Sequence, residues 1–275
     1  MVSSIPDLVA RAYADADLAG LLGRGDWYLV GSRARGFDDE LSDWDTCLLT
    51  AHDPSPQDRA IVSRPSLDRV FGVERPPAPV PSDLRTHVAW RRSGGVEISV
   101  FGPAGREHRE EGGNPIWAYD MRDAIPLRVQ AGVGDPYRAQ IGAAFETARA
   151  AHRDEEYLRF RMSRNEAAAT LGRTDALAQA ITAGLCVQHA CRFWLLAAGS
   201  PYPADKWLPA ALRTVDDAAD LLAVACTVTD AATEPEVRFA ALWTLWRIID
   251  ARAAEVGVDP DLLTGSPFRE RADKP

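Results

Sequence analysis

The sequence predicts an α+β protein with two domains: residues 1–135, built on a mixed β-sheet with flanking helices, and residues 136–275, an α-helical bundle. Three observations carry this prediction. Short apolar runs of strand length mark the first part, whereas alanine-rich segments of helical period fill the second. Gly132, Gly134 and Pro136 interrupt the chain between the two patterns. A chain of 275 residues is long enough to bury two modest cores.

The elements of the first domain follow from the same patterns. Residues 6–22 carry apolar side chains at helical spacing and predict an opening helix. The apolar run 27–30 predicts a buried strand, and a second strand is predicted after the polar loop, with Asp43 and Asp45 on it. In the proline-rich stretch that follows, we expect a short helix near 57–62 and a strand near 70–73.

A hairpin is predicted within residues 84–101. Two alternating runs there flank Gly94-Gly95, a dipeptide suited to a tight turn. Side chains alternate along a strand, so Glu97 should face away from the apolar side of its own run. That apolar side is formed by Val96, Ile98 and Val100.

The rest of the chain is expected to be mainly helical. A short helix carrying Trp117 and an edge strand near 126–131 should complete the first domain. In the second domain, Thr174 and Gly199 are expected to cap the third helix, and Pro235 suits the first turn of the last. The helical period predicts five helices there, over residues 138–152, 155–171, 175–198, 215–228 and 236–256.

Composition limits the classes of function. The net charge of −9, from 31 basic and 40 acidic residues, argues against a protein that grips nucleic acid and favours a cationic substrate. Four cysteines without a Cys-x-x-Cys pair predict buried thiols and no zinc site. No apolar run approaches the roughly 18 residues of a membrane span, and no signal peptide is evident. We therefore expect a cytoplasmic protein that binds neither nucleic acid nor membrane, and the oligomeric state stays open.

The stretch 27–50 carries the strongest functional signal. Its first apolar run ends at Gly31-Ser32, where a tight turn brings the backbone close to another group and Ser32 is placed to cap a helix. Free N–H groups in a first helical turn bind anions, so phosphate is expected at Gly31 and Ser32. Asp43 and Asp45 face one side of the next strand, and paired carboxylates beside a phosphate site suggest a shared Mg²⁺ ion.

The order of these parts resembles the signature of the DNA polymerase β-type nucleotidyltransferase superfamily. In that signature, Gly-Ser is followed about ten residues later by Asp-x-Asp. Gly31-Ser32 and Asp43-Trp44-Asp45 are the matching residues here. Size and layout are most similar to the aminoglycoside adenylyltransferase branch. The structural alternative is a solvated acidic turn, because Asp-x-Asp alone is common.

The resemblance implies further site residues. The superfamily adds a third carboxylate from a later strand, and Glu97 matches it as general base or metal ligand, with a cross-strand ion pair to Arg92 as the alternative. In the adenylyltransferase branch a lysine of the helical domain reaches the nucleotide phosphates. Lys206, in the stiff loop 201–208, is the candidate here, and a solvated lysine beside a packed tryptophan is the alternative. Arg35 completes the expected nucleotide-binding set.

The activity implied by the resemblance is Mg²⁺-dependent transfer of a nucleoside monophosphate to a hydroxyl of a small molecule, such as an aminoglycoside-like antibiotic. ATP is the expected donor. Residues 1–135 would form the nucleotidyltransferase domain, with Asp43 and Asp45 as the Mg²⁺ ligands, and the acceptor would bind between the domains. A protein-modifying enzyme of antitoxin type and a non-catalytic nucleotide-binding module are the alternatives. The candidates for recognising a cationic acceptor, with a solvated helix face as the alternative, are Asp154, Glu155, Glu156 and Glu166.

Two features of the helical domain are assigned to structure alone. His152 and His189 have no second histidine at ligand spacing. The last helix carries an apolar stripe, and such a stripe usually belongs to the core. Its members are Phe239, Leu242, Trp243, Trp246 and Ile249.

Overall fold

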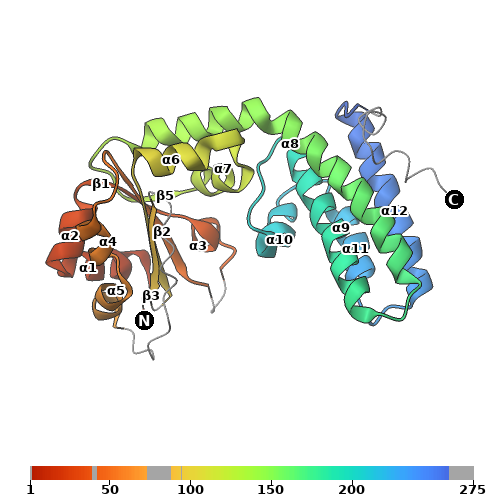
Figure 1. Cartoon of the computed structure of the whole chain (residues 1–275), viewed down its shortest axis with the longest axis horizontal. Helices are drawn as coiled ribbons and strands as arrows, with labels where there is room; N and C mark the ends of the chain where they lie inside the picture. The colour runs from red at the N-terminus through yellow and green to blue at the C-terminus, as the bar shows by residue number, and fades with distance from the viewer. Residues whose placement is uncertain (1, 39–41, 73–87, 94, 260–275) are drawn as a thin grey trace. The chain divides into compact units, whose positions relative to one another are not determined.

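The structure is a computed structural model in which the chain forms two compact units, Met1–Phe145 and Glu146–Pro275. The first unit is α+β and the second is helical, which confirms the predicted fold class (Figure 1). The division falls inside the long helix α8 (Gly134–Leu171), whereas the sequence places the boundary at 135. The structure describes residues 2–38, 42–72, 88–93 and 95–259, with the backbone alone at 64, 65, 68 and 88–93.

The first unit is organised around a mixed sheet. Among the described residues the strand order is β3-β4-β2-β1-β5. β1 lies antiparallel to β2 and to β5, while β4 lies parallel to β2 and antiparallel to β3. The strands are β1 (Gly25–Leu29), β2 (Trp44–Thr50), β3 (Val88–Ser93), β4 (Val96–Phe101) and β5 (Ile125–Arg128).

The predicted hairpin and edge strand are both present. β3 and β4 pair directly on either side of the expected turn. Gly95 has a φ of 75°, which a glycine adopts without strain, and its neighbour Gly94 lies outside the described residues. β5 pairs with β1 alone and so forms one edge of the described sheet.

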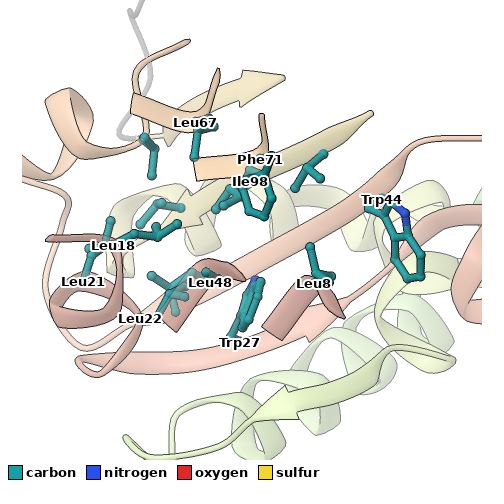
Figure 2. Packing of buried hydrophobic residues seen from close by; sticks show 14 of the residues in the cluster. Leu8, Leu18, Leu21, Leu22, Trp27, Trp44, Leu48, Leu67, Phe71 and Ile98 are labelled. Atoms are coloured by element: carbon teal, nitrogen blue, oxygen red, sulfur yellow. The ribbon is translucent and has the colours of Figure 1, made fainter. Parts of the chain in front are cut away.

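Four helices cover one face of this sheet (Figure 1). Trp27, Trp44, Leu48 and Ile98 project from three strands into this side, where they pack with Phe71 and with leucines of the covering helices (Figure 2). Each fully buried large apolar side chain contributes roughly 1.5–3 kcal/mol, so this layer is a main source of the unit's stability. The covering helices are α1 (Ile5–Ala14), α2 (Ala16–Leu22), α4 (Pro56–Ile61) and α5 (Arg64–Phe71).

Two local predictions on this side are wrong. The opening helix predicted over 6–22 is broken at Asp15, which leaves the helical conformation and caps α2 by accepting the N–H of Leu18. The strand predicted near 70–73 is instead the end of α5 as far as Phe71. Residue 73 lies outside the described residues. The short helix predicted near 57–62 is confirmed as α4.

The opposite face of the sheet is covered by α6 (Pro103–Glu110), by α7 (Pro115–Arg122) and by the start of α8 (Figure 1). Between α6 and α7 lies the 3₁₀ turn η1 (Glu111–Gly113). The ring of Phe101 on β4 packs against Trp117 of α7 with centroids 5.0 Å apart. Sγ of Cys47 lies 4.0 Å from Sδ of Met121, so α7 packs directly on β2. The predicted helix carrying Trp117 is confirmed.

A buried carboxylate in β1 fixes the chain where it enters α8. Asp26 is fully buried, and its two oxygens accept N–H groups from the five consecutive residues 130–134 at distances between 2.6 and 3.2 Å. Burial by itself raises the pKa of a carboxyl, but these N–H groups outweigh it and hold the pKa of Asp26 below its usual range. The connection from β5 to α8 is therefore set by a charge in β1.

The second unit consists of α-helices with one 3₁₀ turn among its described residues. The predicted helices 138–152 and 155–171 are one helix, α8, because neither glycine nor proline separates them. Asp175 rather than Thr174 caps α9, while Gly199 beyond its end has the expected positive φ, 78°. The elements are α9 (Ala176–Ala197), η2 (Asp205–Trp207), α10 (Leu208–Leu212), α11 (Ala219–Thr229) and α12 (Pro235–Glu255), which has Pro235 in its first turn as predicted.

The apolar stripe of α12 is only partly buried. Leu242 and Ile249 lie in the core, but Phe239 is 39% exposed and Trp243 43% exposed, so the core prediction is wrong for these two aromatics. The buried face is rotated from the predicted one and includes Arg238, whose Nε donates to the carbonyl of Val228. A single apolar stripe does not show which of its edges meets the neighbouring helices.

One described helix, α9, is long and apolar enough to cross a membrane by length and composition alone, with a mean hydropathy of 1.2 in its most apolar window. Of that window, 44% is buried inside the unit. The core helix of a globular domain passes the same test, so α9 does not by itself indicate a membrane span.

Candidate functional site

The candidate site begins where β1 ends. The N–H of Val30 donates to the carbonyl of Asp45 at 2.8 Å, and the short helix α3 (Gly31–Arg35) starts at the next residue. Gly31 has a φ of 73°, and a Cβ atom at this position would lie 2.6 Å from Oδ2 of Asp45. Glycine is therefore required both by the backbone conformation and by the carboxylate that packs against it.

Asp45 and Glu97 lie on the α7 side of the sheet. Trp44 is buried toward the opposite side, so strand alternation directs Asp45 to this one, while Asp43 precedes β2. Asp45 stands beside Glu97 in the parallel register of β2 and β4. Oδ1 of Asp43 lies 3.5 Å from where a Cβ of Gly95 would be, so Asp43 is beside the turn that leads into β4.

These carboxylates do not form a complete metal site by themselves. Over residues 2–38, 42–72, 88–93 and 95–259, no group of three or more His, Cys, Asp or Glu side chains is arranged to hold a metal ion. Mg²⁺ differs from metals held in all-protein cages, because it commonly takes one or two carboxylates and completes its shell with water and substrate phosphates. Asp43 and Asp45 suit that mode, in which the phosphates arrive with the substrate.

Ser32 does not cap α3 as predicted. The N-cap is Val30, with no side-chain cap, and Ser32 lies buried within the helix. Its carbonyl closes the helix by accepting the N–H groups of Gly36 and Phe37. The left-handed conformation of Gly31, rather than a hydroxyl, turns the chain into the helix.

Arg35, predicted to bind nucleotide, is fully engaged with the protein. Its side chain is 5% exposed, and Nη1 donates to the carbonyl of Gly31 at 2.9 Å. Nη2 donates to the carbonyl of Tyr119, and the guanidinium lies 4.1 Å over the ring of the same residue. Nη1 is 3.3 Å from Asp120, and Nε is 3.3 Å from Asp123. These contacts occupy the planar fork, so Arg35 is removed from the nucleotide-binding set.

A second arginine of α3 holds the start of the Asp-x-Asp segment. Nε and Nη2 of Arg33 donate to the carbonyl of Ser42 at 3.1 and 2.7 Å. Its guanidinium lies 4.4 Å over the ring of Trp44. The two arginines, two residues apart, thus tie the Gly31 turn to β2 on one side and to α7 on the other.

Asp120, on α7, is a residue of this region that the sequence patterns do not reveal. Its side chain is 26% exposed and pairs with Arg35. Burial raises the pKa of Asp120 to about 6; Arg35 opposes the rise, and the charge of Asp45 adds to it. The charge of Asp45 on β2 is therefore close enough to α7 to affect the ionisation of Asp120. α7 is distant in sequence from the motif, so no local spacing marks Asp120.

In the helical unit, Lys206 lies in η2 with its side chain exposed and Nζ 5.3 Å from the ring centroid of Trp207. This contact is the lysine beside a tryptophan that the sequence offers as the structural alternative. A cavity of about 330 Å³ in the same unit is lined by residues of α9 and α10 and by Asp205, the neighbour of Lys206. A second cavity, of about 380 Å³, lies between α7 and α8 in the first unit. Neither is lined by the three carboxylates of the motif.

Glu156 does not face solvent as an acceptor-binding residue would. It is buried, and its oxygens contact Nδ1 of His189 at 2.7 Å, Nη1 of Arg192 at 3.4 Å and the hydroxyl of Tyr202 at 3.3 Å. Burial alone would raise the pKa of Glu156, but His189 and then Arg192 hold it below its usual range. Glu156 and His189 are therefore structural. Of the other predicted carboxylates, Asp154 pairs with Arg153, Glu155 pairs with Arg159, and Glu166 is exposed.

Comparisons with known proteins add little to this geometry. No protein-family model matches the sequence, and no curated protein matches it. Among solved structures, the chain is similar to a nucleotidyltransferase-like protein from Exiguobacterium sibiricum 255-15, with 14% identity and a TM-score of 0.47. The match covers 96% of this chain and 81% of that one. A likeness at this level does not establish a shared activity.

Proposed function

We propose that this protein is a nucleotidyltransferase that moves a nucleoside monophosphate, with ATP as the expected donor, to a hydroxyl of a small molecule. The observation that carries the proposal is the register of β2 and β4, which sets Asp45 beside Glu97 and against the Gly31 turn. A glycine turn at the start of a helix, two aspartates and a further carboxylate offer backbone donors, metal ligands and a proton acceptor, which suit phosphoryl transfer.

Each group has a role set by its chemistry. The backbone at Gly31 and Ser32 would seat the outer phosphates. Asp43 and Asp45 would hold Mg²⁺. When bound, this ion supplies positive charge that offsets the negative charge developing on the triphosphate. Mg²⁺ needs few protein ligands, so the absence of a three-carboxylate cage among the described residues is compatible with this role.

Glu97 would act as general base. Its carboxylate would take the proton of the acceptor hydroxyl as the hydroxyl oxygen forms a bond to the α-phosphorus. The bond from that phosphorus to the bridging oxygen breaks at the same time, and pyrophosphate leaves. Proton transfer of this kind contributes roughly 10²–10⁴-fold to a rate, and positioning and electrostatics supply most of the rest.

A small-molecule acceptor with positive charge suits the net charge of −9 better than a polyanion does. Lys206 remains the proposed contact to the nucleotide phosphates, because its ammonium is exposed. Glu166, which is also exposed, is the remaining candidate for the acceptor's positive charge.

The proposal is tested with α-labelled ATP, Mg²⁺ and a panel of hydroxylated antibiotics and metabolites. The expected result is pyrophosphate release that depends on one class of acceptor, with label on that acceptor, and no release by Asp45→Asn. A parallel incubation with cell lysate addresses the antitoxin-type alternative, which would give a labelled protein band. Nucleotide binding without pyrophosphate release in either assay would indicate a binding module and contradict the proposal.

A further inference from the structure

We propose that Arg35 is a positioning residue, whose guanidinium fixes the Gly31 turn to α7 so that the turn and the Asp45 carboxylate keep their mutual position. The expected effect on turnover rests on the proposed function, whereas the role of Arg35 in holding the turn does not depend on any activity.

The contacts of Arg35 converge on one short piece of backbone. One guanidinium nitrogen, Nη1, binds the carbonyl of Gly31, while Nη2 binds the carbonyl of Tyr119 on α7. The ring of Tyr119 lies under the guanidinium plane and restricts its orientation. Arginine suits this task because its donors are set in a rigid fork, and lysine would supply the charge without the fork.

Two carboxylates make this buried arrangement stable. A nearly buried guanidinium requires compensating charge, and Asp120 and Asp123 supply it from α7 and from the residue that ends α7. The charged groups that face Asp120 are Arg35, Asp45 and Arg109. Arg35 thus lies between the acidic groups of α7 and the turn that carries the proposed phosphate site.

The position of the turn matters for the site because the carboxylate of Asp45 packs closely against it. Oδ2 of Asp45 is within 2.6 Å of where a side chain of Gly31 would begin, so a shift of the turn moves backbone N–H groups and carboxylate relative to each other. Misplacement of reacting groups by about 1 Å can lower a rate by roughly 10²-fold. Releasing the carbonyl of Gly31 should therefore impair the site without removing any residue that touches substrate.

The test compares Arg35→Lys with a matched control, Arg138→Lys. Arg138 also binds two carbonyls at the end of α7, those of Met121 and Arg122, each at 3.0 Å, but it does not contact Gly31. Both substitutions keep the positive charge and remove a guanidinium that binds backbone carbonyls of α7. Only Arg35→Lys releases the turn.

Hydrogen–deuterium exchange gives a readout that needs no activity. The amides of Gly36 and Phe37 donate to the carbonyl of Ser32 and close α3. We expect these two amides to exchange at least about tenfold faster in Arg35→Lys than in wild type, and at the wild-type rate in Arg138→Lys. With the proposed acceptor and ATP, Arg35→Lys should lower kcat/KM by roughly 10²-fold, mainly through kcat, while Arg138→Lys stays within about threefold.

The two proposals fail in different ways. If the wild-type protein turns over no nucleotide, the proposed function fails and the exchange comparison still decides the role of Arg35. Unchanged exchange at Gly36 and Phe37 in Arg35→Lys would overturn the positioning role, as would wild-type kcat/KM in an active enzyme. If Arg35→Lys does not fold, Asp120→Asn takes its place with faster exchange expected at the same two amides, and wild-type exchange there would equally overturn it.

Discussion

Acidic side chains near the two ends of strand β1 have opposite environments. At its start, Asp26 is surrounded by N–H groups from five consecutive residues, and its pKa is held below the usual range. Beyond its end, Asp45 stands beside Glu97, and burial raises the pKa of Asp120 to about 6, with a smaller contribution from the charge of Asp45. At the first end a carboxylate is surrounded by hydrogen-bond donors. At the second end several carboxylates lie close to one another.

The difference separates a structural acid from candidate functional ones. A carboxylate that accepts several backbone N–H groups stays ionised and fixes those groups in place. Carboxylates that face each other raise one another's pKa, which a protein relieves with a shared proton or a bound cation. On this basis Asp26 serves the fold, and the acidic end of the site is where an external cation and a triphosphate would bind.

The largest expected effect is that of Asp45→Asn. Loss of this carboxylate should lower turnover by about 10³-fold or more, because metal-bound charge stabilisation is worth several kcal/mol in the transition state. The free energy of unfolding should stay the same or rise slightly, because a like-charge contact has been relieved. Turnover assays and thermal melts of Asp45→Asn and Asp43→Asn measure both quantities. Wild-type activity in either variant would contradict the proposed role of Asp43 and Asp45 in catalysis.

Glu97→Gln should come next, with a loss of roughly 10²–10⁴-fold in kcat. Glutamine keeps the shape but cannot accept a proton, so nucleotide affinity and melting temperature should change little if Glu97 is the general base. A weaker Mg²⁺ dependence in addition would identify it as a metal ligand. The control is Arg92→Gln, since Arg92 stands opposite Glu97 in the β3–β4 register. Equal small effects from both substitutions would favour a cross-strand ion pair and no chemistry.

At the other end of β1, Asp26→Asn should lower the free energy of unfolding by roughly 3 kcal/mol, because an amide leaves some of the buried N–H groups without an acceptor. Its kcat, measured well below the melting temperature, should match that of the wild type. Chemical denaturation and steady-state assays test this pairing. If Asp26→Asn kept the wild-type stability but lost turnover, Asp26 would have a catalytic and not a structural role.

A smaller, pH-dependent effect follows from the same carboxylate. Because its pKa is lower in the folded protein than in the unfolded chain, Asp26 contributes stability that is fully present above about pH 4 and is lost as the pH falls through the folded-state pKa. Wild type should therefore lose more stability than Asp26→Asn between about pH 4 and pH 2. Parallel slopes in denaturation experiments over this range would show that Asp26 is not the group responsible.

The sequence was sufficient for the parts that depend on neighbours in the chain. The strand before Gly31, the alternation of Trp44 and Asp45 along β2, and the pairing of β3 with β4 are local patterns, and the structure has each of them in its described part. Glu97 follows from the alternation of its own run together with the third carboxylate that the resemblance implies. The functional roles of these residues remain predictions.

The parts that were missed depend on packing between distant segments. Asp120 faces the site only because α7 packs on β2, and nothing in the spacing of the motif implies that contact. Arg35 is predicted to bind nucleotide, but α7 and its C-cap residue Asp123 supply its partners. Glu156 looks like a surface acid in sequence and is buried by residues of α9 and of the loop at Tyr202.

The most direct test of the proposed nucleotidyltransferase site is a crystal structure with Mn²⁺ in place of Mg²⁺ and a non-hydrolysable nucleoside triphosphate. The account predicts an anomalous peak about 2.1 Å from carboxylate oxygens of Asp43 and Asp45, with the metal also bound to phosphate oxygens and the outer phosphates at Gly31 and Ser32. A triphosphate bound elsewhere, or bound here with no metal at these two aspartates, would contradict it.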